Sequence, residues 1–143
     1  MCSYNRINGT YAAAHHKYLT ETLRDKWGFD GYVMSDWGAV NDRVEDLKAG
    51  LDLEMPSSMG VNDQLIVEAV QNGTLEEKVL DTAVERILNI VYRYAENRDT
   101  EAVFNLDHDH EVAKKVAEET IVLLKNENVL PLTEGEEIAF IGK

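Results

Sequence analysis

The residues best suited to chemistry lie at one point of the chain, Val33-Met34-Ser35-Asp36-Trp37-Gly38, where a short apolar run ends in a carboxylate followed by an indole. A buried strand of an α/β protein is a near-continuous apolar run, and in a (β/α) barrel the chemistry lies where such strands end. Asp36 is therefore the first candidate catalytic residue. Its structural alternative is a cap of the following helix, a position that aspartate often occupies.

The elements around Asp36 alternate between helix and strand, which favours an α/β fold. Apolar spacing predicts a helix from about Ala13 to Trp27, a strand over Tyr32 to Ser35, a helix over Ala39 to Lys48 ended by Gly50, and a short strand over Leu51 to Met55 ended by Pro56. The same pattern predicts later helices over Val61 to Gln71, from Thr74 onward, and over about Glu111 to Lys125. Thr74 and Glu77 have the spacing of a capping box.

Composition and charge narrow the class of protein. The chain has 143 residues, 44% of them hydrophobic, which is typical of a globular domain with a sizeable core. Its net charge of −13 argues against nucleic acid and anionic membrane surfaces as partners. One cysteine, Cys2, cannot form an intramolecular disulfide, and no apolar run of about 18 residues predicts a membrane span. The sequence assigns no compartment.

Both ends of the chain look like interrupted elements. Ile138-Ala139-Phe140-Ile141-Gly142 has the pattern of a first strand, one residue before the sequence stops, and Met1 to Tyr4 has the pattern of a strand end. A lone strand is not stable. We therefore expect a piece of a longer protein, whose unpaired strand edges favour self-association.

Four motifs, in order, resemble glycoside hydrolase family 3, the β-glucosidases and their relatives. Trp27-Gly28-Phe29-Asp30-Gly31-Tyr32-Val33-Met34-Ser35-Asp36-Trp37 resembles the family's nucleophile segment. Ser3 to Gly9 resembles the preceding strand end, and Ala49 to Pro56 resembles the last barrel strand. Leu123 to Leu132 resembles the passage into the family's second, α/β sandwich domain.

The resemblance implies an α/β fold made of parts of two domains. Residues 1–104 would form the C-terminal part of a (β/α) barrel, that is, the last strands and helices of a TIM-like barrel. Residues 105–137 would form a helix and linker, and residues 138–143 the first strand of a truncated α/β sandwich domain.

The activity implied by the resemblance is that of a retaining, exo-acting β-glycosidase of the β-glucosidase type, acting on a carbohydrate substrate without a cofactor. Asp36 would attack the anomeric carbon, while a second acid about 5 Å away protonates the leaving oxygen. Tyr4 would donate its phenol to Asp36 or to the charge developing near the ring oxygen, and Trp37 would stack on the sugar. Without the resemblance, Tyr4 reads as a half-buried strand residue and Trp37 as core.

No second acid in the sequence is convincing as the proton donor. Asp30 lies in the turn before the strand, whereas helix residues Asp42, Glu45 and Asp46 are expected to be solvated. Asp52 and Glu54 lie near the expected site and are assigned structural roles, because the resemblance places the donor in a later region. The pairs His15-His16 and His108/His110 lack a third metal ligand, and the Asn-Gly-Thr sequons at Asn8 and Asn72 are explained by turn and cap geometry.

Other functions remain open at this point. The selecting residues for β-xylosidase or arabinofuranosidase specificity would lie outside the chain, as would the loop that a β-N-acetylhexosaminidase would use. A different class of function is a non-catalytic α/β interaction module, in which acidic helices form the partner surface and Asp36 only caps a helix. For the enzyme hypothesis, the isolated chain is predicted to be inactive on an aryl β-glucoside.

Overall fold

A computed structural model describes residues 1–135 and 137–142 of the chain. The chain divides into two compact units, Met1–Arg98 and Asp99–Lys143, which are described separately. The division falls at the start of the polar segment 98–104.

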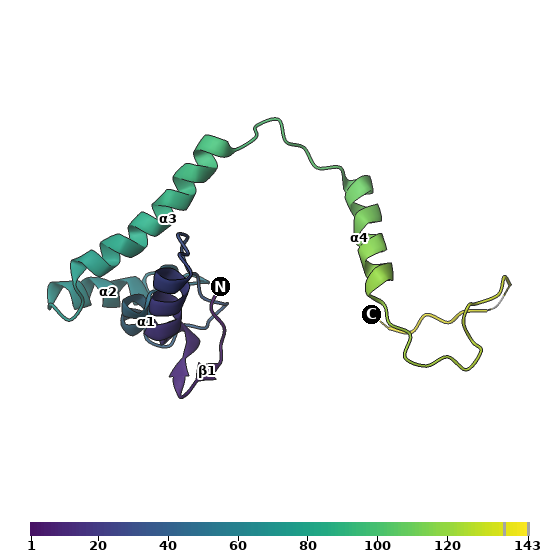
Figure 1. Cartoon of the computed structure of the whole chain (residues 1–143), viewed down its shortest axis with the longest axis horizontal. Coiled ribbons are helices and arrows are strands. Elements are labelled where there is room, and N and C mark those ends of the chain that lie inside the picture. The colour runs from purple at the N-terminus through teal and green to yellow at the C-terminus, as the bar shows by residue number, and fades with distance from the viewer. Residues whose placement is uncertain (136, 143) are drawn as a thin grey trace. The chain divides into compact units, whose positions relative to one another are not determined.

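The first unit begins with a hairpin. Strands β1 (Arg6–Ile7) and β2 (Thr10–Tyr11) pair antiparallel, with Ile7 opposite Thr10 (Figure 1). The two-residue connection, Asn8-Gly9, has φ angles of 50° and 89°. Two positive φ values in succession are those of the hairpin turn that Asn-Gly favours.

Three further segments of the first unit run parallel and carry Asp36. Single parallel bridges join Cys2 to Ser35 and Met34 to Leu53. The strands predicted at 32–35 and 51–55 therefore form isolated bridges instead of continuous ladders. The reason is that side-chain hydrogen bonds replace the next backbone bonds of the ladder. The amide of Val33, for example, donates to an Asp52 carboxylate oxygen at 2.7 Å.

Helices lie between these segments. The 3₁₀-helix η1 (Ala12–Ala14) precedes η2 (Lys17–Lys26), which is wound as a π-helix within the helix predicted from Ala13 to Trp27. Helix α1 (Arg43–Ala49) begins later than the predicted Ala39, because the Asp42 side chain caps it by accepting from the amides of Val44 and Glu45 at 3.1 Å each. It ends at Gly50, whose φ of 111° is left-handed.

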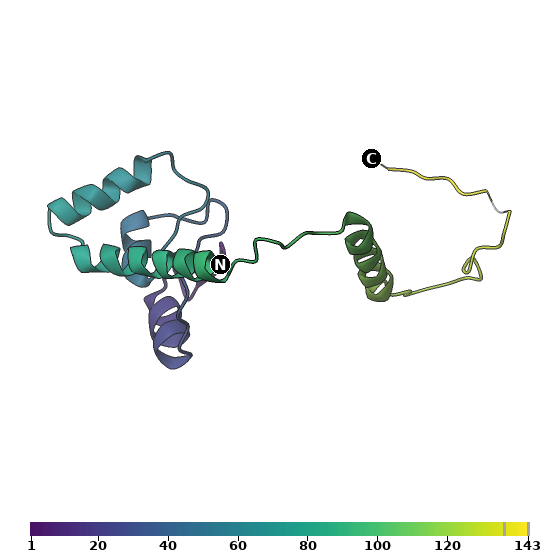
Figure 2. The same ribbon diagram turned by 90° about the horizontal axis from the view of Figure 1, so that it is seen from above.

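Two longer helices complete the first unit. Helix α2 (Val61–Gln71) has the predicted bounds, and helix α3 (Glu77–Asn97) follows after a short turn that is visible in Figure 2. The predicted capping box of Thr74 and Glu77 is wrong, since α3 begins only at Glu77. The Thr74 hydroxyl instead donates to the Asn72 side chain at 2.6 Å and to the Ala69 carbonyl at 3.3 Å, closing the end of α2.

The core of the first unit consists of two apolar clusters on either side of α1, which contacts η1, η2, α2 and α3. One cluster joins the parallel segments to η2 and comprises Cys2, Ala13, Leu19, Val33 and Leu51. The other joins α1, α2 and α3 and comprises Leu47, Ile66, Ala69, Leu75 and Ala83. The parallel segments therefore rest on a packed helical layer.

The second unit consists of helix α4 (Leu106–Thr120) and extended chain. The Asn105 side chain caps α4 by accepting from the amide of His108 at 3.1 Å, so the helix begins and ends about five residues before the predicted Glu111 to Lys125. Residues 138–142, predicted as a strand, are exposed and form no strand in the structure, since a single strand needs a partner. Glu136 and Lys143 lie outside the described residues. None of the described helices is long and apolar enough to cross a membrane.

Candidate functional site

Asp36 lies where the parallel segments end, with its side chain half-buried. Its amide donates to the carbonyl of Cys2 at 3.1 Å, and its Oδ1 accepts from the amide of Trp37 at 2.7 Å. The helix that follows is capped by Asp42. The alternative role of Asp36 as the cap of that helix is therefore wrong.

Tyr4 lies beside Asp36. Its phenol donates to the carbonyl oxygen of Trp37 at 2.8 Å and also interacts with the Asp36 carboxylate. Loss of hydration raises the pKa of the Tyr4 phenol, and hydrogen bonding and charge repulsion from Asp36 raise it further. The phenol therefore stays a proton donor at neutral pH, close to the carboxylate.

Trp37 points its indole away from the core, with 62% of the residue exposed. The reading of this residue as core packing is therefore wrong. Its backbone is fixed on both sides, by the bond from Tyr4 to its carbonyl and by its own amide bond to Asp36. A flat apolar ring is thus held at the surface directly beside a carboxylate.

Asp52 is fully engaged in structural interactions. Its side chain, 1% exposed, pairs with Arg24 of η2 at 2.5 Å and with Arg86 of α3 at 3.0 Å, and it accepts the Val33 amide. Hydrogen bonds from two arginines and a backbone amide thus occupy this carboxylate. The structural role expected for Asp52 agrees with this geometry.

The remaining acids near the site also have structural partners. Glu54 accepts from the side-chain amide of Asn62 at 2.6 Å. Asp30 pairs with Arg93 at 2.7 Å, and this hydrogen bond and charge lower the pKa of the exposed carboxyl. None of these acids faces Asp36 as a free proton donor.

Asp46 departs from expectation, because it is completely buried and not solvated. It lies on the inner face of α1 with Arg43 and Leu47, three or four residues apart in the helical repeat. Neither carboxylate oxygen meets a hydrogen-bond donor at good geometry. Burial raises the pKa of this carboxyl from 3.8 to about 6, which the nearby Asn41 amide and Arg43 charge offset only in part.

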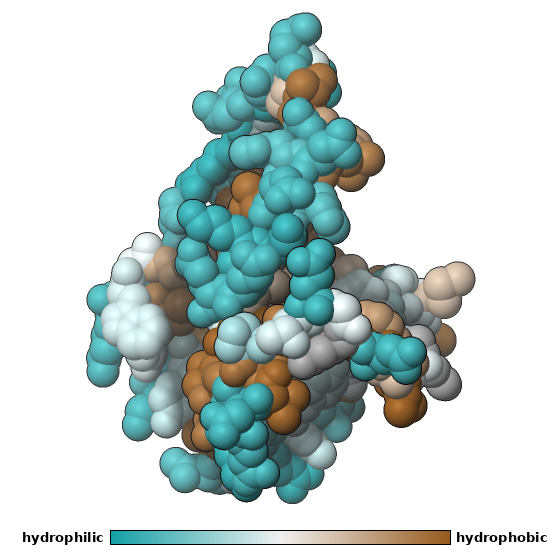
Figure 3. Space-filling view, turned by 90° about the vertical axis from the view of Figure 1, so that its right-hand side faces the viewer, coloured by the Kyte–Doolittle hydropathy of each residue, from teal (hydrophilic) through white to brown (hydrophobic). Residues whose placement is uncertain are grey.

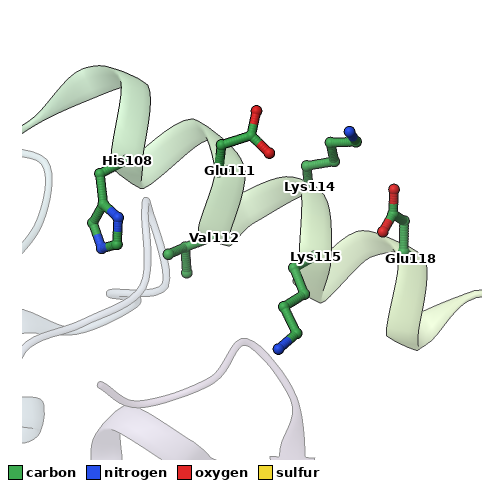
Figure 4. A pocket seen from close by; sticks show the side chains of 6 residues that line it. All are labelled: His108, Glu111, Val112, Lys114, Lys115 and Glu118. Atoms are coloured by element: carbon green, nitrogen blue, oxygen red, sulfur yellow. The ribbon is translucent and has the colours of Figure 1, made fainter.

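The two histidines of the first unit have local partners. His15 stacks on Tyr18, with ring centroids 4.4 Å apart, and His16 lies 3.5 Å from Glu21. Across residues 1–135 and 137–142, no three His, Cys, Asp or Glu side chains converge to hold a metal ion. A surface hollow in the second unit is lined by α4 alone, and Figure 4 shows its side chains on one helix: His108, Glu111, Val112, Lys114, Lys115 and Glu118.

Sequence reasoning missed the polar residues that hold the site together. Ser35, Arg24, Arg43 and Arg86 all bind backbone or carboxylate groups of the parallel segments. Arg43, for example, donates to the carbonyls of Leu51 at 3.1 Å and Asp52 at 2.9 Å. The local pattern does not reveal these partners, because each is at least eight residues away in the chain.

Comparison with known proteins adds independent information about this site. Residues 1–90 match the family model described as the glycosyl hydrolase family 3 N-terminal domain. The thermostable β-glucosidase B of Acetivibrio thermocellus is 52% identical over 143 residues, covering 99% of this chain and 19% of that protein. An exo-α-(1→6)-L-arabinopyranosidase of Bifidobacterium longum is 46% identical, covering 100% of this chain and 20% of that protein.

Solved structures agree. The structure of β-glucosidase 3B from Thermotoga neapolitana in complex with α-D-glucose superposes with a TM-score of 0.76 at 38% identity, covering 92% of this chain and 20% of that one. The chain thus spans about a fifth of the length of these relatives. On the strength of the matched domain and of these identities, the chain belongs to glycosyl hydrolase family 3.

Proposed function

We propose that the chain is the nucleophile-bearing part of a retaining, exo-acting β-glycosidase of the β-glucosidase type. The observation that carries the proposal is the position of Asp36. Its carboxylate lies at the end of the parallel segments and does not cap the following helix, because Asp42 does so. The phenol of Tyr4 and the exposed indole of Trp37 are its neighbours. The family and the β-glucosidase names among the relatives supply the reaction class.

In the proposed reaction, an Asp36 oxygen attacks the anomeric carbon of a terminal β-linked sugar. The bond from that carbon to the leaving oxygen breaks, and a separate acid protonates the leaving oxygen. Water then attacks the same carbon and releases the sugar and the Asp36 carboxylate. Tyr4 would donate toward the charge that develops beside Asp36, and Trp37 would stack on the apolar face of the sugar.

The proton donor is assigned to polypeptide outside the 143 residues. Asp52 and Glu54, the acids of the last parallel segment, have structural partners at 2.5 to 3.0 Å. A retaining mechanism needs two carboxyl groups about 5 Å apart. We therefore expect no turnover of an aryl β-glucoside by the isolated chain.

The same proposal assigns the architecture. The order of parallel segments and intervening helices fits the last part of a (β/α) barrel within residues 1–104. Residues 105–137 would connect it to a second domain that begins at 138–143. Hydrophobic groups, brown in Figure 3, interrupt the hydrophilic surface. Helix α3 exposes Val84, Leu88, Val91 and Tyr92, which further polypeptide or a second copy would cover.

The test is a chimera. The 143 residues replace the matching segment of the thermostable β-glucosidase B of Acetivibrio thermocellus, to which they are 52% identical. We expect the chimera to hydrolyse an aryl β-glucoside, and a 2-deoxy-2-fluoro-β-glucoside to label the peptide that carries Asp36. Asp36→Asn should reduce turnover by roughly a thousandfold or more, as the loss of a covalent nucleophile does.

A matched control is Asp30→Asn, which removes an exposed carboxylate paired only with Arg93. This variant should keep its turnover. Label on another peptide, or normal turnover by Asp36→Asn, would refute the assignment. A folded chimera without label or turnover would favour the interaction-module hypothesis.

A further inference from the structure

Ser35, the residue directly before Asp36, is a completely buried polar side chain that the proposed mechanism does not use. Its hydroxyl donates to the carbonyl of Met55 at 3.0 Å and accepts from the amide of the same residue at 2.7 Å. A serine hydroxyl has one proton to donate and two lone pairs to accept. One side chain therefore binds both polar groups of a single residue in the last parallel segment.

Met55 also holds the chain on the other side of Asp36. Its carbonyl accepts from the amide of Gly38 at 2.9 Å. The residue before Asp36 and the residue two positions after it are thus tied to the same residue. The amide of Asp36 is fixed separately, by its 3.1 Å bond to Cys2.

The Asp36 side chain depends on this backbone for its direction. The carboxylate is half-buried, and its partners are the neighbouring Trp37 amide at 2.7 Å and the phenol of Tyr4. The bond from Trp37 moves with the segment, and the Tyr4 phenol is itself bound to the Trp37 carbonyl. The direction of the carboxylate therefore depends on where the segment 35–38 is held.

We propose that Ser35 is a positioning residue, whose two bonds to Met55 set the direction from which the Asp36 carboxylate approaches the sugar. This inference rests on the proposed function, since it concerns the same nucleophile. Displacing a reacting group by about 1 Å can cost about a hundredfold in rate. Removing the hydroxyl also leaves the Met55 amide without its partner, so the Asp36 segment loses two of the bonds that join it to the last parallel segment.

The experiment measures covalent labelling in the chimera with β-glucosidase B. The probe is 2,4-dinitrophenyl 2-deoxy-2-fluoro-β-glucoside, whose leaving group needs little acid assistance, so the rate reports the attack by Asp36. We expect Ser35→Ala to slow labelling about ten- to a hundredfold, with the half-saturating probe concentration changed less than about threefold. Ser35→Cys, which keeps a weak donor, should give an intermediate rate and serves as the test if the alanine variant does not fold.

Thr20→Val is the matched control. The Thr20 hydroxyl also donates to a backbone carbonyl, that of Ala49 at 2.9 Å, but it has no bond to the segment around Asp36. This variant should label at the parent rate even if its melting temperature falls. The contrast separates positioning from a general loss of stability.

Two results would overturn the inference. The first is a folded Ser35→Ala or Ser35→Cys variant that labels at the parent rate. The second is a slowing that Thr20→Val reproduces in proportion to its loss of melting temperature. An unlabelled parent chimera overturns the proposed function and this inference together, whereas a labelled parent with an unaffected Ser35→Ala overturns this inference alone.

Discussion

The buried carboxyl of Asp46 predicts a pH dependence of stability that a single substitution removes. This side chain is inaccessible to solvent, and burial raises its pKa from 3.8 to about 6. Because the folded state holds the proton more tightly than the unfolded state, folding is most favoured when the carboxyl is protonated. The free energy of unfolding attributable to Asp46 is therefore highest below about pH 4, falls as the pH rises to about 6, and is constant above that.

The size of the effect follows from the difference in proton affinity. The interval from 3.8 to about 6 corresponds to about 3 kcal/mol, at about 1.4 kcal/mol for each tenfold change. The charge of Arg43 is already included in the pKa of about 6, and relaxation of the structure around a buried charge reduces the difference, so we expect about 2 to 3 kcal/mol. Asp46→Asn should show no such decline, because its amide does not titrate.

The assay is urea unfolding of the 143-residue chain and of the chimera, followed by circular dichroism from pH 4 to pH 8. The quantity to compare is the change in unfolding free energy between these two pH values, since a fixed cost of burying the asparagine amide cancels in it. Glu45→Gln, an exposed neighbour on α1 that pairs with Lys48, is the control and should follow the parent. Parallel pH curves for the parent and Asp46→Asn would refute the reasoning.

Two further predictions concern the charge network and the sugar platform. Asp52→Asn leaves Arg24 and Arg86 without their buried partner and should lower the free energy of unfolding by about 3 to 5 kcal/mol. Asp30→Asn breaks an exposed pair and should lower it by less than about 1 kcal/mol. Urea unfolding measures both losses, and equal losses would contradict the role of the Asp52 network. Trp37→Ala in the chimera should raise KM for an aryl β-glucoside about tenfold without lowering the melting temperature, because the indole is 62% exposed; an unchanged KM would remove the stacking role.

Local patterns predicted the helices well where the signals were local. Helix α2 has its predicted bounds, because its apolar spacing and the closing Asn72-Gly73 act within one or two turns. Thr74 has the spacing of a capping box, but its hydroxyl found acceptors at the end of the preceding helix. When a short polar side chain has two possible sets of partners, the three-dimensional geometry determines which hydrogen bond forms, and sequence spacing does not show this geometry.

The candidate site divides in the same way. Asp36 and Trp37 are proposed as site residues because an apolar run ending in a carboxylate is a local pattern that the sequence shows directly. Asp46 was misassigned, since an acid on a short helix is usually solvated and its burial depends on the parallel segments packing against α1. The partners of Asp52 are 28 and 34 residues away along the chain, so no spacing rule indicates them.

The buried polar residues of this unit have a common physical reason. Parallel segments that form only single bridges leave backbone amides without ladder partners, and a buried amide must be satisfied. Asp52 satisfies the amide of Val33, and Ser35 satisfies that of Met55. Side chains thus continue the connection between segments beyond the point where the backbone ladder stops. As a result, Asp36 can lie past the last bridge with its carboxylate half-buried, while the chain on both sides of it stays fixed.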